Sequence, residues 1–217
     1  MIRLEEVFKY YRSHGHTKVI LDHVSMEFRS GNNYGILGIN GAGTSTMMKL
    51  LAGTEMPNSG RVHRDARISW PLGFSGGLHG KMTGRENVMF VARVYGQDVK
   101  RVVDFVEDFA EIGAYMDVPF YHYSSGMAQR LAFGLSMAVD FEVFLIDEVT
   151  AVGDARFQRR CHEEFRKRRS KADIIMVSHS APTLLEYCNR GVVLAHGKLH
   201  LFNSVEDAIE LYNRLNA

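Results

Sequence analysis

The sequence predicts an α/β fold in which a helical block is inserted into a core of alternating strands and helices. Three observations support this: apolar or alternating strand patterns at both ends of the chain, helical periodicity over about residues 84–139, and a glycine-rich turn near residue 40. We expect residues 1–217 to form one domain. Its α/β core, with an antiparallel β subdomain, would be made of residues 1–83 and 140–217.

The composition is that of an ordinary globular protein without a strong charge bias. The 217 residues include 26 Lys plus Arg and 25 Asp plus Glu, so the formal net charge is +1. This balance argues against a protein that mainly neutralises nucleic-acid phosphates. No stretch has the ~20 apolar residues of a membrane helix, and we expect no signal peptide. Cys161 and Cys188 are expected to be free thiols.

Periodicity assigns the elements of the first third of the chain. The expected elements are strands over 2–8, 19–28, 33–38 and 66–70, and a helix over 47–52. Gly53 is suited to cap the C-terminus of that helix. The glycine-rich residues 71–84 are expected to form a loop.

Capping motifs mark two of the later helices. Thr83 and Glu86 match a capping box and predict a helix from residue 84 to about 94, and Ser204 with Asp207 opens the last helix. The elements expected between them are helices over 99–112, 125–139, 154–169 and 182–188, and strands over 143–147, 174–178, 191–195 and 199–202. The last helix has an apolar face of Val205, Ala208, Ile209, Tyr212 and Leu215.

The glycine-rich turn lies between a predicted strand and a predicted helix, which is the context of a phosphate-binding P-loop. Its residues are Gly38, Ile39, Asn40, Gly41, Ala42, Gly43, Thr44, Ser45 and Thr46. Glycines let backbone N–H groups approach phosphate oxygens, and the helix N-terminus adds a favourable dipole. Ser45 would bind Mg²⁺. A P-loop has a lysine before this serine, but here the residue is Thr44; the alternative is a glycine-rich turn that binds nothing.

The predicted strand 143–147 ends in two adjacent carboxylates, Asp147 and Glu148. Asp147 lies where an aspartate would reach Mg²⁺ through water. Glu148 lies where a general base would activate a water against the γ-phosphate of a nucleotide. Two adjacent acids at a strand end could also form a solvated turn.

Five short motifs follow one another along the chain. After the P-loop come a signature-like segment, Asp147 with Glu148, Gly153 with Asp154, and Ser178 with His179. The signature-like segment consists of Tyr123, Ser124, Ser125, Gly126 and Met127. Their order and spacing resemble the nucleotide-binding subunits of ABC transporters. More narrowly, the sequence is similar to the capsular-polysaccharide export ATPases of Gram-negative bacteria, over essentially the whole chain.

The resemblance implies an ATPase that works as two copies enclosing two ATP molecules with Mg²⁺. Ser124 and Gly126 of one copy would bind the γ-phosphate held by the P-loop of the other. Asp154 would lie at the dimer interface, and His179 would hold the γ-phosphate and the attacking water. Tyr11 matches the aromatic residue that stacks on adenine, with Tyr10 as the alternative.

The resemblance also implies a membrane-spanning permease as a separate subunit and no nucleic-acid partner. The chain would be peripheral, at the cytoplasmic face of the bacterial inner membrane, with membrane contact only through the permease. Gly73 takes the place of the glutamine that ABC proteins have in this loop. The apolar residues expected to receive a permease helix are Trp70, Pro71, Leu72, Phe74 and Leu78. The alternative is that these residues pack internally.

Thr44 leaves several functions open. Without the lysine charge, we expect weakened nucleotide binding and sharply reduced hydrolysis. Thr44 fits a variant of a parent protein that has the lysine, a natural switch with little turnover, or an unusual active site. The alternatives to capsule export are a regulatory nucleotide-binding module, an O-antigen or teichoic-acid export ATPase, and a soluble ABC protein of translation or DNA repair.

Overall fold

The structure is a computed structural model that describes the chain except residues 14, 40, 73–76, 148–153, 170 and 217. The chain forms two compact units. The first consists of residues 1–71, 142–149 and 172–217, and the second of residues 72–141 and 150–171. This division differs from the expected core of 1–83 and 140–217, because the helix over 155–169 falls in the second unit. The expectation of a single domain stays a prediction.

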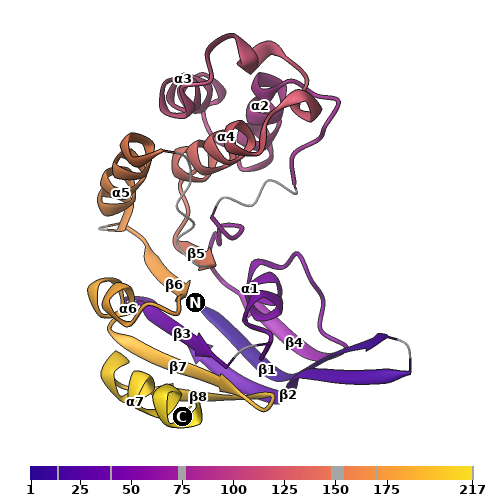
Figure 1. Cartoon of the computed structure of the whole chain (residues 1–217). Coiled ribbons are helices and arrows are strands. Elements are labelled where there is room, and N and C mark those ends of the chain that lie inside the picture. Colours follow the sequence, from indigo (N-terminus) through magenta and orange to yellow (C-terminus); the bar gives the residue numbers. More distant parts are fainter. Residues whose placement is uncertain (14, 40, 73–76, 148–153, 170, 217) are drawn as a thin grey trace. The chain divides into compact units, whose positions relative to one another are not determined.

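The first unit contains two sheets (Figure 1). The antiparallel sheet has the order β2-β1-β4 and the larger sheet the order β5-β6-β3-β7-β8. The bounds are β1 Ile2–Ser13, β2 His16–Phe28, β3 Tyr34–Gly38, β4 Ser59–Arg64, β5 Val143–Asp147, β6 Asp173–Val177, β7 Arg190–Ala195 and β8 Lys198–Phe202. All pairs of the larger sheet are parallel except β7 with β8. Its central strands are buried apolar runs, as strands covered on both faces require.

The helices of the first unit are α1 (Thr44–Ala52), α6 (Ala181–Tyr187) and α7 (Val205–Asn216). Gly53 caps the C-terminus of α1 with φ 79°, which confirms the predicted stop. Buried side chains of β1, β2, β3 and α1 form one hydrophobic core with those of β5, β6 and β7. The P-loop sequence therefore connects two elements, β3 and α1, that both belong to this core.

The second unit is helical. It contains α2 (Gly84–Val94), α3 (Val99–Ala110), α4 (Ser125–Ala138) and α5 (Ala155–Arg169), with 3-10 helices η1 (Gly113–Asp117) and η2 (Phe120–His122). Both bonds of the predicted capping box are present: Thr83 Oγ1 accepts from Glu86 N, and the Glu86 carboxylate accepts from Thr83 N. The rings of Phe109, Phe133 and Phe157 pack between α3, α4 and α5.

Several elements differ from the sequence-based assignment: β1, β2 and α1 are longer than expected, and three further differences have a clear physical reason. Strand β4, which pairs with β1, was not predicted because its residues are mostly polar and lack alternation. The strand expected over 66–70 was wrong: among these residues only Ile68 makes a bridge, to Val143. The helix expected over 99–112 ends at Ala110, because Glu111 adopts the left-handed conformation with φ 51°.

Candidate functional site

The residues predicted to bind phosphate or Mg²⁺ lie at the ends of three neighbouring parallel strands. Strand β6 lies between β3 and β5, and Val177 of β6 is in register with both Ile36 and Asp147. The P-loop follows β3, Asp147 ends β5, and Ser178 with His179 follows β6. The carboxyl ends of these strands therefore bring all three motifs to one edge of the sheet, where α/β proteins bind ligands.

The P-loop has the backbone that anion binding requires. Gly41 and Gly43 have φ values of 73° and 101°, a region that favours glycine. Ala42 N donates to Ile39 O at 2.8 Å, and Met47 N donates to Gly43 O at 2.9 Å, which starts α1. Gly43 is the N-cap of α1 and provides no side-chain cap, and the first turn has no acidic residue. The first N–H groups of α1 thus have no acceptor from a capping side chain, and they suit a phosphate.

Two glycines of the loop are required by close packing. A side chain on Gly43 would overlap Cγ2 of Ile20, in strand β2, and a side chain on Gly38 would overlap Cγ2 of Thr44. The loop is therefore held directly against β2. The Thr44 methyl group lies over Gly38, and the threonine side chain carries no positive charge.

The groups predicted to hold Mg²⁺ are few. Ser45 is exposed in the first turn of α1, and Asp147 is half-buried at the end of β5. Within the described part of the chain, no group of three or more His, Cys, Asp or Glu side chains could hold a metal. Mg²⁺ is usually bound by one or two protein ligands with waters and substrate phosphates, so a sparse donor set fits it. Glu148, like Asn40, Gly73, Phe74 and Gly153, lies outside the described residues.

His179 is exposed directly after β6. Its Nδ1 atom lies 3.2 Å from the hydroxyl of Tyr212 on α7. Ser178 is buried, and its hydroxyl accepts a hydrogen bond from Ser180 N at 3.1 Å. Sequence reasoning placed Tyr212 only on an apolar helix face and missed its contact with the histidine. The available signal was the hydroxyl of Tyr212, because a tyrosine on an otherwise apolar helix face needs a hydrogen-bond partner.

Tyr11 lies on the P-loop side of the antiparallel sheet. It is directly opposite Lys18 on β2, so the two side chains share a face, and Ile20, two residues beyond Lys18, reaches the P-loop. The Tyr11 side chain is 41% exposed, and Lys9 Nζ lies 4.9 Å from its ring centroid. Tyr10, the alternative, is the next residue along the strand and so faces the other side. This placement favours Tyr11 as the base-stacking residue.

The signature-like segment begins α4 in the second unit. Ser124 is the N-cap of α4, and its hydroxyl accepts from Met127 N at 3.3 Å. Space is open around Gly126, since a side chain there would meet no described atom within 4 Å. Tyr123 Oη donates to Tyr115 O at 2.5 Å, and burial raises the pKa of Tyr123. The serine and glycine are thus accessible, while the tyrosine anchors the segment.

The carboxylate of Asp154 forms hydrogen bonds within its own chain. Its carboxylate accepts from Phe157 N at 2.9 Å and Arg156 N at 3.0 Å, which caps the start of α5. Arg130 on α4 donates to the same carboxylate at 3.0 Å. The backbone hydrogen bond from Phe157 is the largest cause that lowers the pKa of Asp154. The expected role of Asp154 at a dimer interface stays a prediction.

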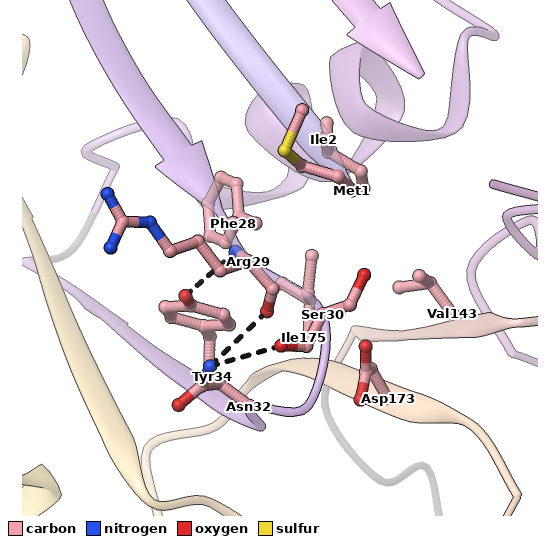
Figure 2. Close-up of a pocket in the computed structure, with 10 residues that line it drawn as sticks. All are labelled: Met1, Ile2, Phe28, Arg29, Ser30, Asn32, Tyr34, Val143, Asp173 and Ile175. Atoms are coloured by element: carbon pink, nitrogen blue, oxygen red, sulfur yellow. Dashed lines mark hydrogen bonds between the residues drawn. The ribbon is translucent and has the colours of Figure 1, made fainter. Parts of the chain in front are cut away.

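A small pocket lies at the opposite edge of the larger sheet (Figure 2). Its lining includes the first residues of β3, β5 and β6, namely Tyr34, Val143 and Asp173. Arg29 N donates to the Tyr34 hydroxyl at 2.9 Å within it. Its volume of about 10 Å³ has room for one water molecule, which excludes a nucleotide. The P-loop edge is the better candidate site.

Known proteins show similarity over most of the chain. The ABC transporter family matches residues 21–151. The chain is 45% identical over 217 residues to the polysialic acid transport ATP-binding protein KpsT of Escherichia coli, covering 99% of both chains. It is 44% identical over 215 residues to the capsule polysaccharide export ATP-binding protein CtrD of Neisseria meningitidis serogroup B, covering 99% of this chain and 100% of CtrD.

The fold also matches a solved structure. The dimeric ATP-binding cassette MJ0796, in a post-hydrolysis state bound to ADP and phosphate, superposes with a TM-score of 0.75 at 19% identity. The match covers 94% of this chain and 99% of the cassette. In the part of the chain that the structure describes, no helix is long and apolar enough to cross a membrane. The chain belongs to the ABC transporter family, as an ATP-binding domain.

Proposed function

We propose that this chain is the ATP-binding and hydrolysing subunit of an exporter that moves capsular polysaccharide across the bacterial inner membrane. The supporting observation is full-length identity of 44–45% to ATP-binding proteins named for capsule polysaccharide export and polysialic acid transport. The P-loop, Asp147 and His179 meet at one sheet edge in this chain, as an ATPase site requires. The O-antigen and teichoic-acid alternatives have weaker support, because the export ATP-binding proteins named for them are only 34% and 32% identical to this chain.

Each residue of the site has a distinct task in this proposal. Tyr11 stacks on adenine, and backbone N–H groups from Gly41 to Thr46 bind the phosphates. Ser45 and Asp147 bind Mg²⁺, which neutralises phosphate charge when bound. Glu148 takes a proton from the attacking water, and His179 holds that water near the γ-phosphate.

The second phosphate contact comes from another copy of the chain. Ser124 and the N-terminus of α4 bind the γ-phosphate across a homodimer, since their N–H groups favour negative charge. ATP binding then closes the dimer and hydrolysis reopens it. A separate membrane-spanning permease converts this motion into export, which places the chain at the cytoplasmic face of the membrane.

Thr44 sets the expected rate. A threonine cannot supply the charge that a P-loop lysine gives the β- and γ-phosphates. Loss of one preorganised charge contact in the transition state costs about 100-fold or more in rate. The backbone N–H groups and Ser45 remain, so ATP binding is reduced less than turnover.

The test is a comparison of steady-state ATPase rates between the chain and its Thr44→Lys variant, each co-expressed with a candidate membrane-spanning permease. We expect co-purification with the permease and at least an approximately 100-fold faster rate in the variant. Equal and robust rates would contradict the assigned effect of Thr44. Failure of either protein to bind a permease would contradict the exporter function.

A regulatory, non-hydrolysing module is the second candidate, and Thr44 is the observation that favours it. The two candidates differ in turnover. Suppose that the chain bound to its permease forms the closed dimer with ATP but hydrolyses no ATP, while polysaccharide transport proceeds in membranes. The regulatory function would then replace the motor function.

A further inference from the structure

Strand β2 places a lysine beside the P-loop that lacks one. A Cβ atom added to Gly41, in the middle of the loop, would lie 3.3 Å from Lys18 Nζ. Ile20, two residues further along the strand, contacts the loop at Gly43. Two side chains of one strand therefore line the loop, and one of them ends in an ammonium group.

We propose that Lys18 is a nucleotide-binding residue that supplies the positive charge missing at Thr44 to the phosphate chain of ATP. The inference rests on the proposed ATP-dependent function. It adds a residue that lies outside the P-loop in sequence, 26 positions before Thr44.

The charge of Lys18 is available. Among the described residues, its ammonium group has no carboxylate within ion-pair distance and donates no hydrogen bond. Lys9 on the neighbouring strand differs, because it pairs with Glu55 at 2.5 Å and donates to Met56 O at 2.9 Å. The first turn of α1 has no acidic residue to compete for Lys18. An anion in the loop would be its natural partner.

The position of Lys18 also fits the path of a nucleotide. Lys18 is directly opposite Tyr11 in the β1–β2 ladder. A base stacked on Tyr11 and phosphates at the start of α1 would therefore have Lys18 on the same face of the sheet as the base. A flexible ammonium can contact phosphate from this side as a point charge.

The test measures the affinity of Mg²⁺-ATP by calorimetry for the full chain and a matched set of variants. Lys18→Gln removes the charge and keeps a polar side chain, and Lys18→Arg keeps the charge. Lys49→Gln removes an exposed charge at the other end of α1 as a control. Thermal unfolding without nucleotide checks that each variant is folded.

We expect Lys18→Gln to weaken ATP binding by about 10- to 100-fold, the range for one charge-assisted hydrogen bond. Lys18→Arg should stay within about threefold of the parent, and Lys49→Gln should bind as the parent does. The parent should also lose more affinity than Lys18→Gln when salt is raised, because an exposed charge is screened.

A double-mutant cycle with Thr44→Lys identifies the role. If Lys18 replaces the missing lysine, Lys18→Gln should cost less than about threefold once Lys stands at position 44, because the two charges serve the same phosphates. An equally large cost in both backgrounds would show that Lys18 acts independently of position 44, and it would overturn the substitution proposed here.

The remaining outcomes separate this inference from the proposed function. If the parent binds ATP and Lys18→Gln binds it equally well, or if Lys49→Gln weakens binding as much, the role of Lys18 is refuted and the ATPase function stands. If only Thr44→Lys binds ATP, Lys18 does not compensate. If neither the parent nor Thr44→Lys binds ATP, the proposed function itself fails.

Discussion

Helices α1 and α4 both begin at residues predicted to contact phosphate, but their N-termini are capped in different ways. The N-cap residue of α1 is Gly43, which has φ 101° and provides no side-chain cap. The N-cap residue of α4 is Ser124, whose hydroxyl accepts from Met127 N at 3.3 Å. The backbone N–H groups of the first turn of α1 therefore have no acceptor from a capping side chain and can bind an external one. In α4, the N-cap side chain already accepts a hydrogen bond from one of these N–H groups.

A third helix start extends the comparison. Helix α5 begins beside Asp154, whose carboxylate accepts two backbone N–H bonds and pairs with Arg130. The Asp154 carboxylate therefore already occupies the position at this N-terminus that an external anion would take. The three helix starts thus differ in how much of the terminus is left for a ligand: most in α1, part in α4 and least in α5.

The largest expected effect comes from replacing the cap of α1. Gly43→Ala should weaken ATP binding by about 100-fold, because strain of roughly 1–2 kcal/mol from the backbone and roughly 1–3 kcal/mol from overpacking would displace the N–H groups that bind phosphate. The reason is double: φ 101° disfavours alanine, and the methyl group would overlap Ile20. Calorimetric titration with Mg²⁺-ATP measures the loss.

Gly15→Ala is the matched control for Gly43→Ala. Gly15 has φ 80°, but a side chain there would meet no described atom within 4 Å. It should lose some stability and keep its ATP affinity. Parent-like binding by Gly43→Ala would show that the contact between the P-loop and β2 is dispensable.

The cap of α4 allows stability to be separated from phosphate binding. Ser124→Ala should cost about 1 kcal/mol of stability through the lost cap. Ser124→Asp keeps a good cap but places a negative charge where the γ-phosphate of the partner's ATP would bind. We expect Ser124→Asp to unfold at the parental temperature and to weaken ATP-dependent dimerisation at least about tenfold.

Thermal unfolding and light scattering with and without Mg²⁺-ATP distinguish the two Ser124 variants. Normal ATP-dependent dimers of Ser124→Asp would remove Ser124 from the proposed contact across the dimer.

A smaller effect is expected at the histidine that follows β6. Tyr212→Phe removes the hydroxyl 3.2 Å from His179 Nδ1. The loss of one such bond, about 1 kcal/mol, should lower the ATPase rate by about fivefold in the Thr44→Lys background, with ATP affinity unchanged. Tyr34→Phe, which removes a hydroxyl at the opposite sheet edge, is the control. Equal rates in both variants would mean that Tyr212 does not position His179.

The smallest effect is expected at α5 and depends on pH. The folded state lowers the pKa of Asp154 below its ordinary value of 3.8, chiefly through the Phe157 N–H bond. The charged form therefore stabilises the fold above pH 4, and this contribution is lost as pH falls through the lowered pKa. Asp154→Asn should be slightly less stable than the parent at pH 7, and this difference should shrink as pH falls through the lowered pKa. Denaturation over a pH series measures this, and a difference that stays constant would contradict the assignment.

Much of the fold could be predicted because its signals lie in neighbouring residues. The capping box of Thr83 and Glu86, the stop at Gly53 and the apolar run of β5 each depend on a few consecutive positions. Strand β4 could not be found in this way. Its polar residues pair with β1, so the partner strand rather than the local pattern decides its structure.

The candidate site also has features that local sequence patterns predict and features that depend on distant partners. The motifs at the ends of β3, β5 and β6 could be predicted from local patterns, because glycines, carboxylates and helix caps act through their immediate neighbours. Three contacts arise only when the chain folds: Lys18 lies beside Gly41, Tyr212 lies beside His179, and Asp154 accepts a hydrogen bond from Arg130. These contacts join residues 23, 33 and 24 positions apart. They depend on strand pairing and helix packing, which no local pattern encodes.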